Sequence, residues 1–341
     1  MIKKLKSINY KFYKSKTTSF ILVLSVVLFL TTSCSNIGLS TVQTVSDKVM
    51  HKLNKDLTPH VPSGISVILN ERYEPEDINS LLDIYYPEVT QPLEKFPVVI
   101  WIHGGSWVSG SKDYIANYAK ILASNGYVVA VVDYTLAPMQ YHPYQAIQIN
   151  KALAFLTENA ERFFIDTEKM FLAGDSAGAN LCAQLTNAIY LPSYAGLINI
   201  TPSLTSAQLR GVILQCGPYD INLFDIDGFL SGFIKLIGKT YSGEDDFLNE
   251  PSFQPASVAQ YVTADFPPAF ISAGNNDPLE SQSIALAQQL DSLGVYVDTL
   301  FFPKDYRPKL PHEYQFNLDG EAGKLALERT IVFLQKQCNV E

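Results

Sequence analysis

The pentapeptide G-D-S-A-G at residues 174–178 directly follows the apolar run 170–173 and precedes a helix-compatible stretch, 179–185. This pattern predicts a strand that turns sharply into a helix, because glycines on either side of the serine leave room for a crowded backbone. The Ser176 hydroxyl would then be exposed at the helix start, where backbone amides favour negative charge. Glycine and serine are also common in ordinary turns, so the remaining sequence must decide between the two interpretations.

Apolar segments and helix-like segments alternate along most of the chain. Nearly continuous apolar runs, typical of strands buried on both faces of a parallel sheet, lie at residues 97–102, 127–132, 211–214 and 268–272. Helical candidates lie at residues 114–124, 145–159, 177–189, 280–293 and 320–337. The pattern predicts one α/β domain over residues 64–341, with a mostly parallel central sheet and helices on both faces.

Residues 221–240 interrupt this alternation. They are rich in Phe, Leu and Ile, and they fall between two expected core strands. One interpretation is a small helical lid over a functional site. The alternative is a helix that packs on a face of the sheet.

Residues 1–33 differ from the rest, since six lysines and no acidic residue accompany the apolar stretch 20–30. The stretch is shorter than the ~20 residues of a membrane span, which predicts a cleaved export signal; an uncleaved anchor is the alternative. Small residues before Cys34 resemble the lipobox of bacterial lipoproteins, although Thr31 stands where an aliphatic residue is usual. We expect a lipid on Cys34 and attachment to the bacterial cell envelope, or otherwise a periplasmic or secreted protein. The polar residues 34–63 would form a tether.

Charge and cysteine content bear on the partners of the chain. Loss of residues 1–33 would leave 19 basic and 34 acidic side chains, changing the net charge from −9 to −15. Such an acidic domain argues against nucleic acid as a partner.

Cys182, Cys216 and Cys338 lie in apolar segments and are expected to be free thiols. No Cys and His residues have metal-ligand spacing, so no metal site is expected.

Serine chemistry requires a base and a carboxylate that orients the base. Of the five histidines only His312 follows Ser176, so a chain order of serine, acid and histidine leaves His312 as the base. Asp277 follows the apolar strand 268–272, and a carboxylate there would face the same sheet edge as Ser176. Asp220, which also follows a strand, is the alternative acid.

An attacked acyl group also needs amide donors for its developing oxyanion. Ala177, the residue after the serine, supplies one. The loop H-G-G-S-W at residues 103–107 follows the strand 97–102, and its glycines allow the backbone to approach a substrate. We assign Gly105 to this oxyanion hole, with its neighbours Gly104 and Ser106 completing the loop.

Four motifs in this order resemble the hormone-sensitive-lipase-like esterases of the α/β-hydrolase superfamily: H-G-G-S-W at 103–107, D-Y-T-L-A-P at 133–138, G-D-S-A-G at 174–178 and N-D-P-L at 276–279. The resemblance covers about residues 82–334. It implies the α/β-hydrolase fold and hydrolysis of small carboxylic esters, which we expect to have short acyl chains, without a cofactor. Ser176 would be the nucleophile, His312 the base and Asp277 the residue that orients it.

Three residues depart from the pattern of these esterases. Ser106 replaces the third glycine of H-G-G-G, Thr135 replaces the arginine of Y-R-L-A-P, and Glu313 stands where glycine usually follows the base. A serine can supply the main-chain donor if its φ stays negative, so we expect weaker or altered activity at most. The H-G-G-S-W form also resembles arylformamidases, which makes formamide cleavage the alternative reaction. An inactive binding module on this fold fits less well, because all three catalytic residues are present.

Overall fold

The structure is a computed structural model that describes residues 35–89 and 94–339. The expected export signal, residues 1–33, and Cys34 lie outside the described residues. One sheet of eight strands forms the centre of the described chain, in the order β1-β2-β4-β3-β5-β6-β7-β8. The strands are β1 (Ile65–Arg72), β2 (Leu81–Pro87), β3 (Phe96–Ile102), β4 (Val128–Val132), β5 (Ile165–Asp175), β6 (Leu209–Gln215), β7 (Ala269–Ala273) and β8 (Val297–Phe301).

The sheet is antiparallel at one edge and parallel elsewhere. β2 pairs antiparallel with β1 and with β4, whereas β4, β3, β5, β6, β7 and β8 run parallel. The predicted parallel sheet is therefore confirmed. Because parallel strands end at a common edge, the loops that follow β3, β5 and β7 are brought together there.

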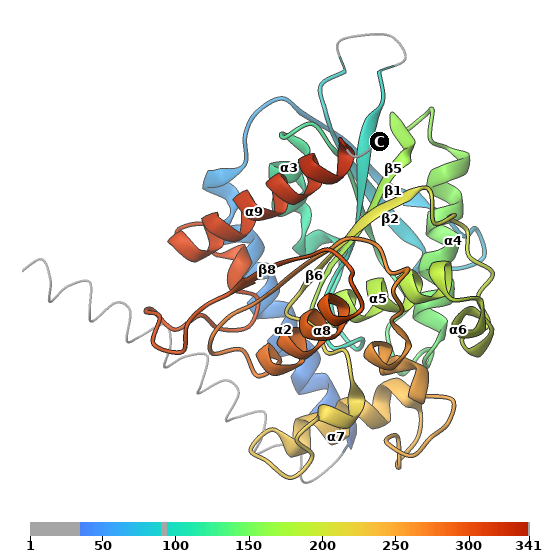
Figure 1. Ribbon diagram of the computed structural model, residues 1–341, viewed down its shortest axis with the longest axis vertical. Coiled ribbons are helices and arrows are strands. Elements are labelled where there is room, and N and C mark those ends of the chain that lie inside the picture. The colour runs from blue at the N-terminus through green and yellow to red at the C-terminus, as the bar shows by residue number, and fades with distance from the viewer. Residues whose placement is uncertain (1–34, 90–93, 340–341) are drawn as a thin grey trace, which may run out of the picture.

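Helices cover both faces of the sheet, as the continuous apolar runs predicted (Figure 1). In β3, Val98 and Ile100 pack into the core on one face, while Val99 and Trp101 pack into the core on the other. The α-helices are α2 (Ser35–Asp56), α3 (Ala116–Ala123), α4 (Tyr144–Glu158), α5 (Ala177–Tyr190), α6 (Pro192–Leu197), α7 (Ser231–Ser242), α8 (Glu280–Ser292) and α9 (Glu321–Cys338). Short 3-10 helices are η1 (Thr58–His60), η2 (Lys112–Tyr114), η3 (Ile221–Leu223), η4 (Gln254–Ala256), η5 (Val258–Tyr261) and η6 (Tyr314–Phe316).

Residues 34–63 are not the polar tether that the sequence suggested, because they include the long helix α2 and the short helix η1. Val42 and Met50 on α2 are buried, and apolar residues at helical spacing between them give this polar segment one face that packs on the domain. Gln43 Nε2 also donates a hydrogen bond to the carbonyl oxygen of Val108, 2.9 Å away. None of the helices in the described part of the chain is long and apolar enough to cross a membrane.

The candidate lid, residues 221–240, contains η3 and most of α7. α7 contacts α2, and Figure 1 shows α7 beyond the end of the sheet from which α5 begins. The ring of Tyr241 on α7 stacks on Trp107 with ring centroids 4.4 Å apart. α7 thus packs against the H-G-G-S-W loop, and its movement as a lid stays a prediction.

Candidate active site

Ser176 lies at the sharp turn between β5 and α5 that the pentapeptide predicted. Its backbone has a φ of 51° and a ψ of −121°, and its amide donates to the carbonyl oxygen of Gln215 at 2.8 Å. A Cβ atom added at Gly174 would lie 2.6 Å from the carbonyl carbon of Gly178. Any side chain at Gly178 would collide with the carbonyl oxygen of Ile102 at the end of β3. The two glycines are therefore required, Gly174 by contacts within the turn and Gly178 by contact with the end of β3.

The structure brings Ser176, His312 and Asp277 together. His312 Nε2 lies 3.0 Å from Ser176 Oγ, and His312 Nδ1 lies 2.9 Å from Asp277 Oδ2. The amide of Leu279 donates to Asp277 Oδ1 at 2.8 Å, which fixes the carboxylate. Asp220, the alternative acid, instead accepts a hydrogen bond from the Asn222 amide where η3 begins.

The electrostatic surroundings of His312 suit a base that becomes charged during a reaction. Burial opposes a charge on the ring, yet Asp277, then Glu313 and Asp175, raise the pKa of His312 to about 9. An imidazolium formed by taking a proton from the Ser176 hydroxyl is therefore stabilised in place.

The H-G-G-S-W loop supplies free amide donors, although one predicted donor is already used. The Gly104 amide donates to Asp175 Oδ2 at 2.9 Å and so is not available to a substrate oxygen, which corrects its assignment to the oxyanion hole. Within residues 35–89 and 94–339, the amides of Gly105, Ser106 and Ala177 have no hydrogen-bond acceptor. These three amides can donate to a bound oxyanion.

The backbone of Ser106 differs from the expectation of a negative φ. Ser106 has a φ of 54° and Trp107 a φ of 60°, both in the left-handed region that glycine occupies most easily. The loop therefore keeps a conformation suited to the third glycine of H-G-G-G, and the serine tolerates the strain.

Two residues outside the predicted site hold this loop in place. His103 Nδ1 lies 2.7 Å from the carbonyl oxygen of Gly104, and its ring stacks on Tyr134 with centroids 4.4 Å apart. The Tyr134 hydroxyl donates to the carbonyl oxygen of His103 at 3.0 Å. Tyr134 belongs to D-Y-T-L-A-P, so that motif supports the oxyanion loop.

Asp175 and Glu313 are buried residues of the site to which the sequence analysis gave no role, although it noted Glu313 as a departure from the family pattern. Asp175 accepts a hydrogen bond from Trp101 Nε1 at 2.8 Å, and Glu313 Oε1 lies 3.8 Å from His312 Nε2. Each stands next to a predicted residue in the chain, Asp175 before Ser176 and Glu313 after His312. The sequence could have indicated both residues, because each places a charged side chain directly beside a catalytic candidate.

Among the described residues, one group of side chains could offer a metal ion three ligand atoms. These atoms of Cys216, Asp277 and His312 lie within 4.8 Å of one another, although the sequence showed no metal-ligand spacing. Burial raises the pKa of the Cys216 thiol well above its ordinary value, so the neutral thiol, a poor ligand, is its stable form. Asp277 and His312 already bind each other.

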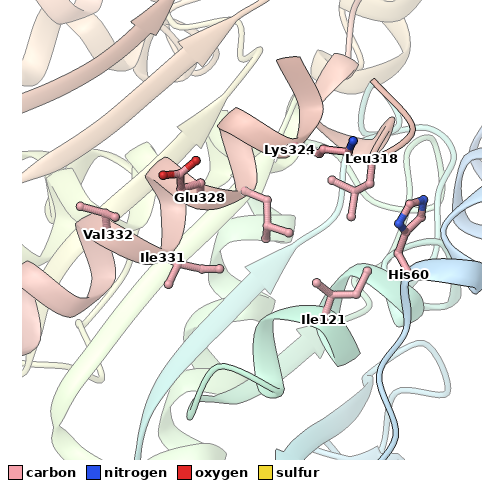
Figure 2. A pocket seen from close by; sticks show the side chains of 8 residues that line it. His60, Ile121, Leu318, Lys324, Glu328, Ile331 and Val332 are labelled. Atoms are coloured by element: carbon pink, nitrogen blue, oxygen red, sulfur yellow. The ribbon is translucent and has the colours of Figure 1, made fainter. Parts of the chain in front are cut away.

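A separate hollow of about 390 Å³ lies between α3 and α9 (Figure 2). Its lining is mostly apolar and includes Ile121, Leu318 and Ile331. No residue of the predicted site lines it, so it does not contribute to the arrangement around Ser176.

Comparisons with known proteins agree with this fold. The chain is 26% identical over 207 residues to the putative alpha/beta hydrolase R526 of Acanthamoeba polyphaga mimivirus, covering 59% of this chain and 58% of that protein. It is 28% identical over 261 residues to carboxylesterase NlhH of Mycobacterium tuberculosis, covering 74% and 77% of the two chains. Esterase B of Lactobacillus rhamnosis has a similar solved structure, with a TM-score of 0.75 and 26% identity over 88% of this chain and 97% of that one.

The fold and these similarities define a class, the carboxylesterase-type α/β-hydrolases. The chain belongs in particular to the BD-FAE family, because that family's model matches residues 82–290, more than half of the chain.

Proposed function

We propose that the chain hydrolyses carboxylic esters through an acyl-enzyme intermediate on Ser176. Ser176 Oγ attacks the acyl carbon while His312 Nε2 takes its proton, and the same nitrogen returns the proton to the departing alcohol. Asp277 holds the ring so that Nε2 faces the serine. The 3.0 Å approach of Nε2 to Oγ is the observation that carries this proposal.

The amides of Gly105, Ser106 and Ala177 stabilise the negative oxygen of the tetrahedral intermediate. Water, activated by His312, then releases the acid, and no step requires a cofactor. These roles are supported by the lack of other acceptors for the three amides among the described residues.

We propose short acyl chains for the substrate. The esterase B of Lactobacillus rhamnosis, which is 26% identical to this chain, has a solved structure inhibited by a C4-C4 tributyrin phosphonate. The test is a chain-length panel of p-nitrophenyl esters, run beside N-formyl aromatic amides. Faster cleavage of acetate or butyrate supports the proposal, faster cleavage of the formamides favours the arylformamidase alternative, and a preference for long chains contradicts the proposed acyl length.

The nucleophile is tested by Ser176→Ala, which should lower turnover by roughly a million-fold. Ser283→Ala is the matched control, because the Ser283 hydroxyl is buried without a hydrogen-bond partner in the described structure. Retention of most esterase activity by Ser176→Ala would contradict the mechanism.

We also propose that the protein is exported and carries a lipid on Cys34. The lysine-rich, then apolar, residues 1–33 and the small residues before the cysteine support this proposal. Incorporation of an alkyne-labelled fatty acid that Cys34→Ala abolishes is the expected result, and equal labelling of both proteins contradicts it.

A further inference from the structure

Two buried carboxyl groups, those of Asp175 and Glu313, meet beside the predicted base. Both oxygens of Asp175 accept hydrogen bonds, one from Trp101 Nε1 at 2.8 Å and the other from the Gly104 amide at 2.9 Å. The Glu313 side chain hydrogen-bonds to Asp175, and its Oε1 lies 3.8 Å from His312 Nε2. The pair thus contacts the oxyanion loop on one side and the base on the other.

The pair holds one proton near neutral pH. Two carboxylates in contact inside a protein repel each other, and burial raises the pKa of both groups. The N–H donors on both oxygens of Asp175 favour its ionised form, so the shared proton resides on Glu313. Glu313 is then a neutral acid that donates to Asp175.

The other titratable groups around the pair leave this assignment in place. They come from the elements packed around it: His103 after β3, Tyr118 on α3, Tyr134 after β4, Cys182 on α5, Cys216 after β6, Asp277 after β7 and His312 next to Glu313. Burial raises the pKa of the Tyr118 and Tyr134 hydroxyls and of the Cys182 thiol, so these three groups are neutral at pH 7. Burial lowers the pKa of His103, so this ring is neutral at pH 7. Cys216 is a neutral thiol, and Asp277 is bound to His312.

The backbone at Glu313 shows that the side chain is kept at a conformational cost. Its φ is 59° and its ψ 33°, a left-handed conformation in which glycine is easier and a side chain is strained. Only 7% of the residue is exposed, so solubility does not explain the glutamate. A strained backbone of this kind persists where surrounding contacts hold the residue in place, and such residues cluster at functional sites.

We propose that Glu313, as a neutral acid, is a positioning residue that ties the histidine loop to the oxyanion loop through Asp175. The link runs from the Glu313 carboxyl to Asp175 and on to the Gly104 amide, so that His312 Nε2 and the free amides of the oxyanion loop keep their relative positions. This inference rests on the proposed ester hydrolysis.

The charge of Glu313 also affects the base directly. His312 must be neutral to take the serine proton, and an ionised Glu313 at 3.8 Å from Nε2 favours the imidazolium before any reaction begins. Burial, partly opposed by His312 and reinforced by Asp175, raises the pKa of Glu313 from 4.5 to about 8. The proton is therefore present at pH 7 and lost as the pH rises through about 8. Ionised Glu313 then helps to hold the proton on His312, whose pKa is about 9, so the rise of activity with pH should be delayed to higher pH.

The test compares Glu313→Gln with Glu313→Gly in pH–rate profiles of kcat and kcat/KM on p-nitrophenyl acetate from pH 6 to 10. The amide of Glu313→Gln donates to Asp175 at every pH, so its kcat at pH 7 should stay within about 3-fold of wild type. Above pH 8 it lacks the charge that holds the proton on His312, so its activity should rise at a lower pH than that of the wild type. Glu313→Gly relieves the left-handed strain and folds, but it removes the link. Its kcat should fall by about 10-fold or more with KM within about 3-fold, because misplaced catalytic groups affect turnover more than binding.

Three results would overturn the inference: a Glu313→Gly protein with wild-type kcat and pH profile, a Glu313→Gln protein as slow as Glu313→Gly, or wild-type and Glu313→Gln profiles that rise at the same pH. Failure of the proposed function has a different signature. In that case the wild-type protein itself shows no esterase activity that Ser176→Ala abolishes.

Discussion

Replacing Gly178 with alanine should move Ser176 and α5 away from the oxyanion loop that follows β3, without changing any catalytic group. Gly178 lies in the first turn of α5, where an added Cβ would collide with the carbonyl oxygen of Ile102 and lie 2.7 Å from that of His103. Reaching the 3.4 Å of ordinary contact with the second oxygen alone requires a shift of at least about 0.7 Å between α5 and the end of β3. Both obstacles are backbone atoms, so no side chain can rotate away.

This shift acts on the reacting geometry directly, because α5 begins beside Ser176 and β3 leads into the oxyanion loop. Misplacement by about 1 Å can cost 10²-fold in rate, so we expect kcat to fall by about 10- to 100-fold. Overpacking should lower the free energy of unfolding by about 1–3 kcal/mol, partly offset by the helix preference of alanine. The assays are initial rates on p-nitrophenyl acetate and urea unfolding followed by circular dichroism.

Gly196→Ala on α6 is the matched control. Nothing lies within 4 Å of a Cβ added there, so activity should be unchanged and stability equal or higher by up to about 1 kcal/mol. A Gly178→Ala protein as active and as stable as Gly196→Ala would contradict this prediction.

Two further predictions concern the support of the site. Trp101→Phe removes the indole donor to the buried Asp175 and should lower the free energy of unfolding in urea by about 1–3 kcal/mol more than Trp107→Phe does. Trp107→Phe is the control, because Trp107 Nε1 has no hydrogen-bond partner in the described structure. An equal loss of stability in both proteins would contradict this prediction. A protein that starts at Ser35 should keep full esterase activity, whereas one that starts at Ser63 should be less active and less stable, because it lacks the buried face of α2 and the contact of that helix with Val108. Equal rates and melting temperatures for the two truncated proteins would show that α2 does not brace the loop.

Much of the fold could be predicted because its strands are buried on both faces. Residues such as Val98 to Ile102 form uninterrupted apolar runs, which distinguish a covered parallel sheet from an exposed one. That Ser176, His312 and Asp277 lie close together could be predicted, because loops that follow parallel strands meet at one edge of the sheet. Chain order then left few candidates for the base and the acid.

The remaining features depend on contacts between residues far apart in sequence. α2 is rich in Ser, Thr and Val, which favour helices weakly, and only its packing on the domain makes it a helix. The Gly104 amide was assigned to the oxyanion hole because nothing in the sequence shows that Asp175, 71 residues away, accepts its hydrogen bond. The positive φ of Ser106 likewise arises from the loop's surroundings and not from its residue type.

Labelling with a fluorophosphonate tests the central claim, that His312 activates Ser176 as a nucleophile, most directly. Such a probe reacts covalently with an activated serine, and peptide mass spectrometry identifies the modified residue. We predict a single adduct on Ser176, absent in Ser176→Ala and strongly reduced in His312→Ala. Folded wild-type protein that is not labelled, or is labelled equally well without His312, would contradict the account.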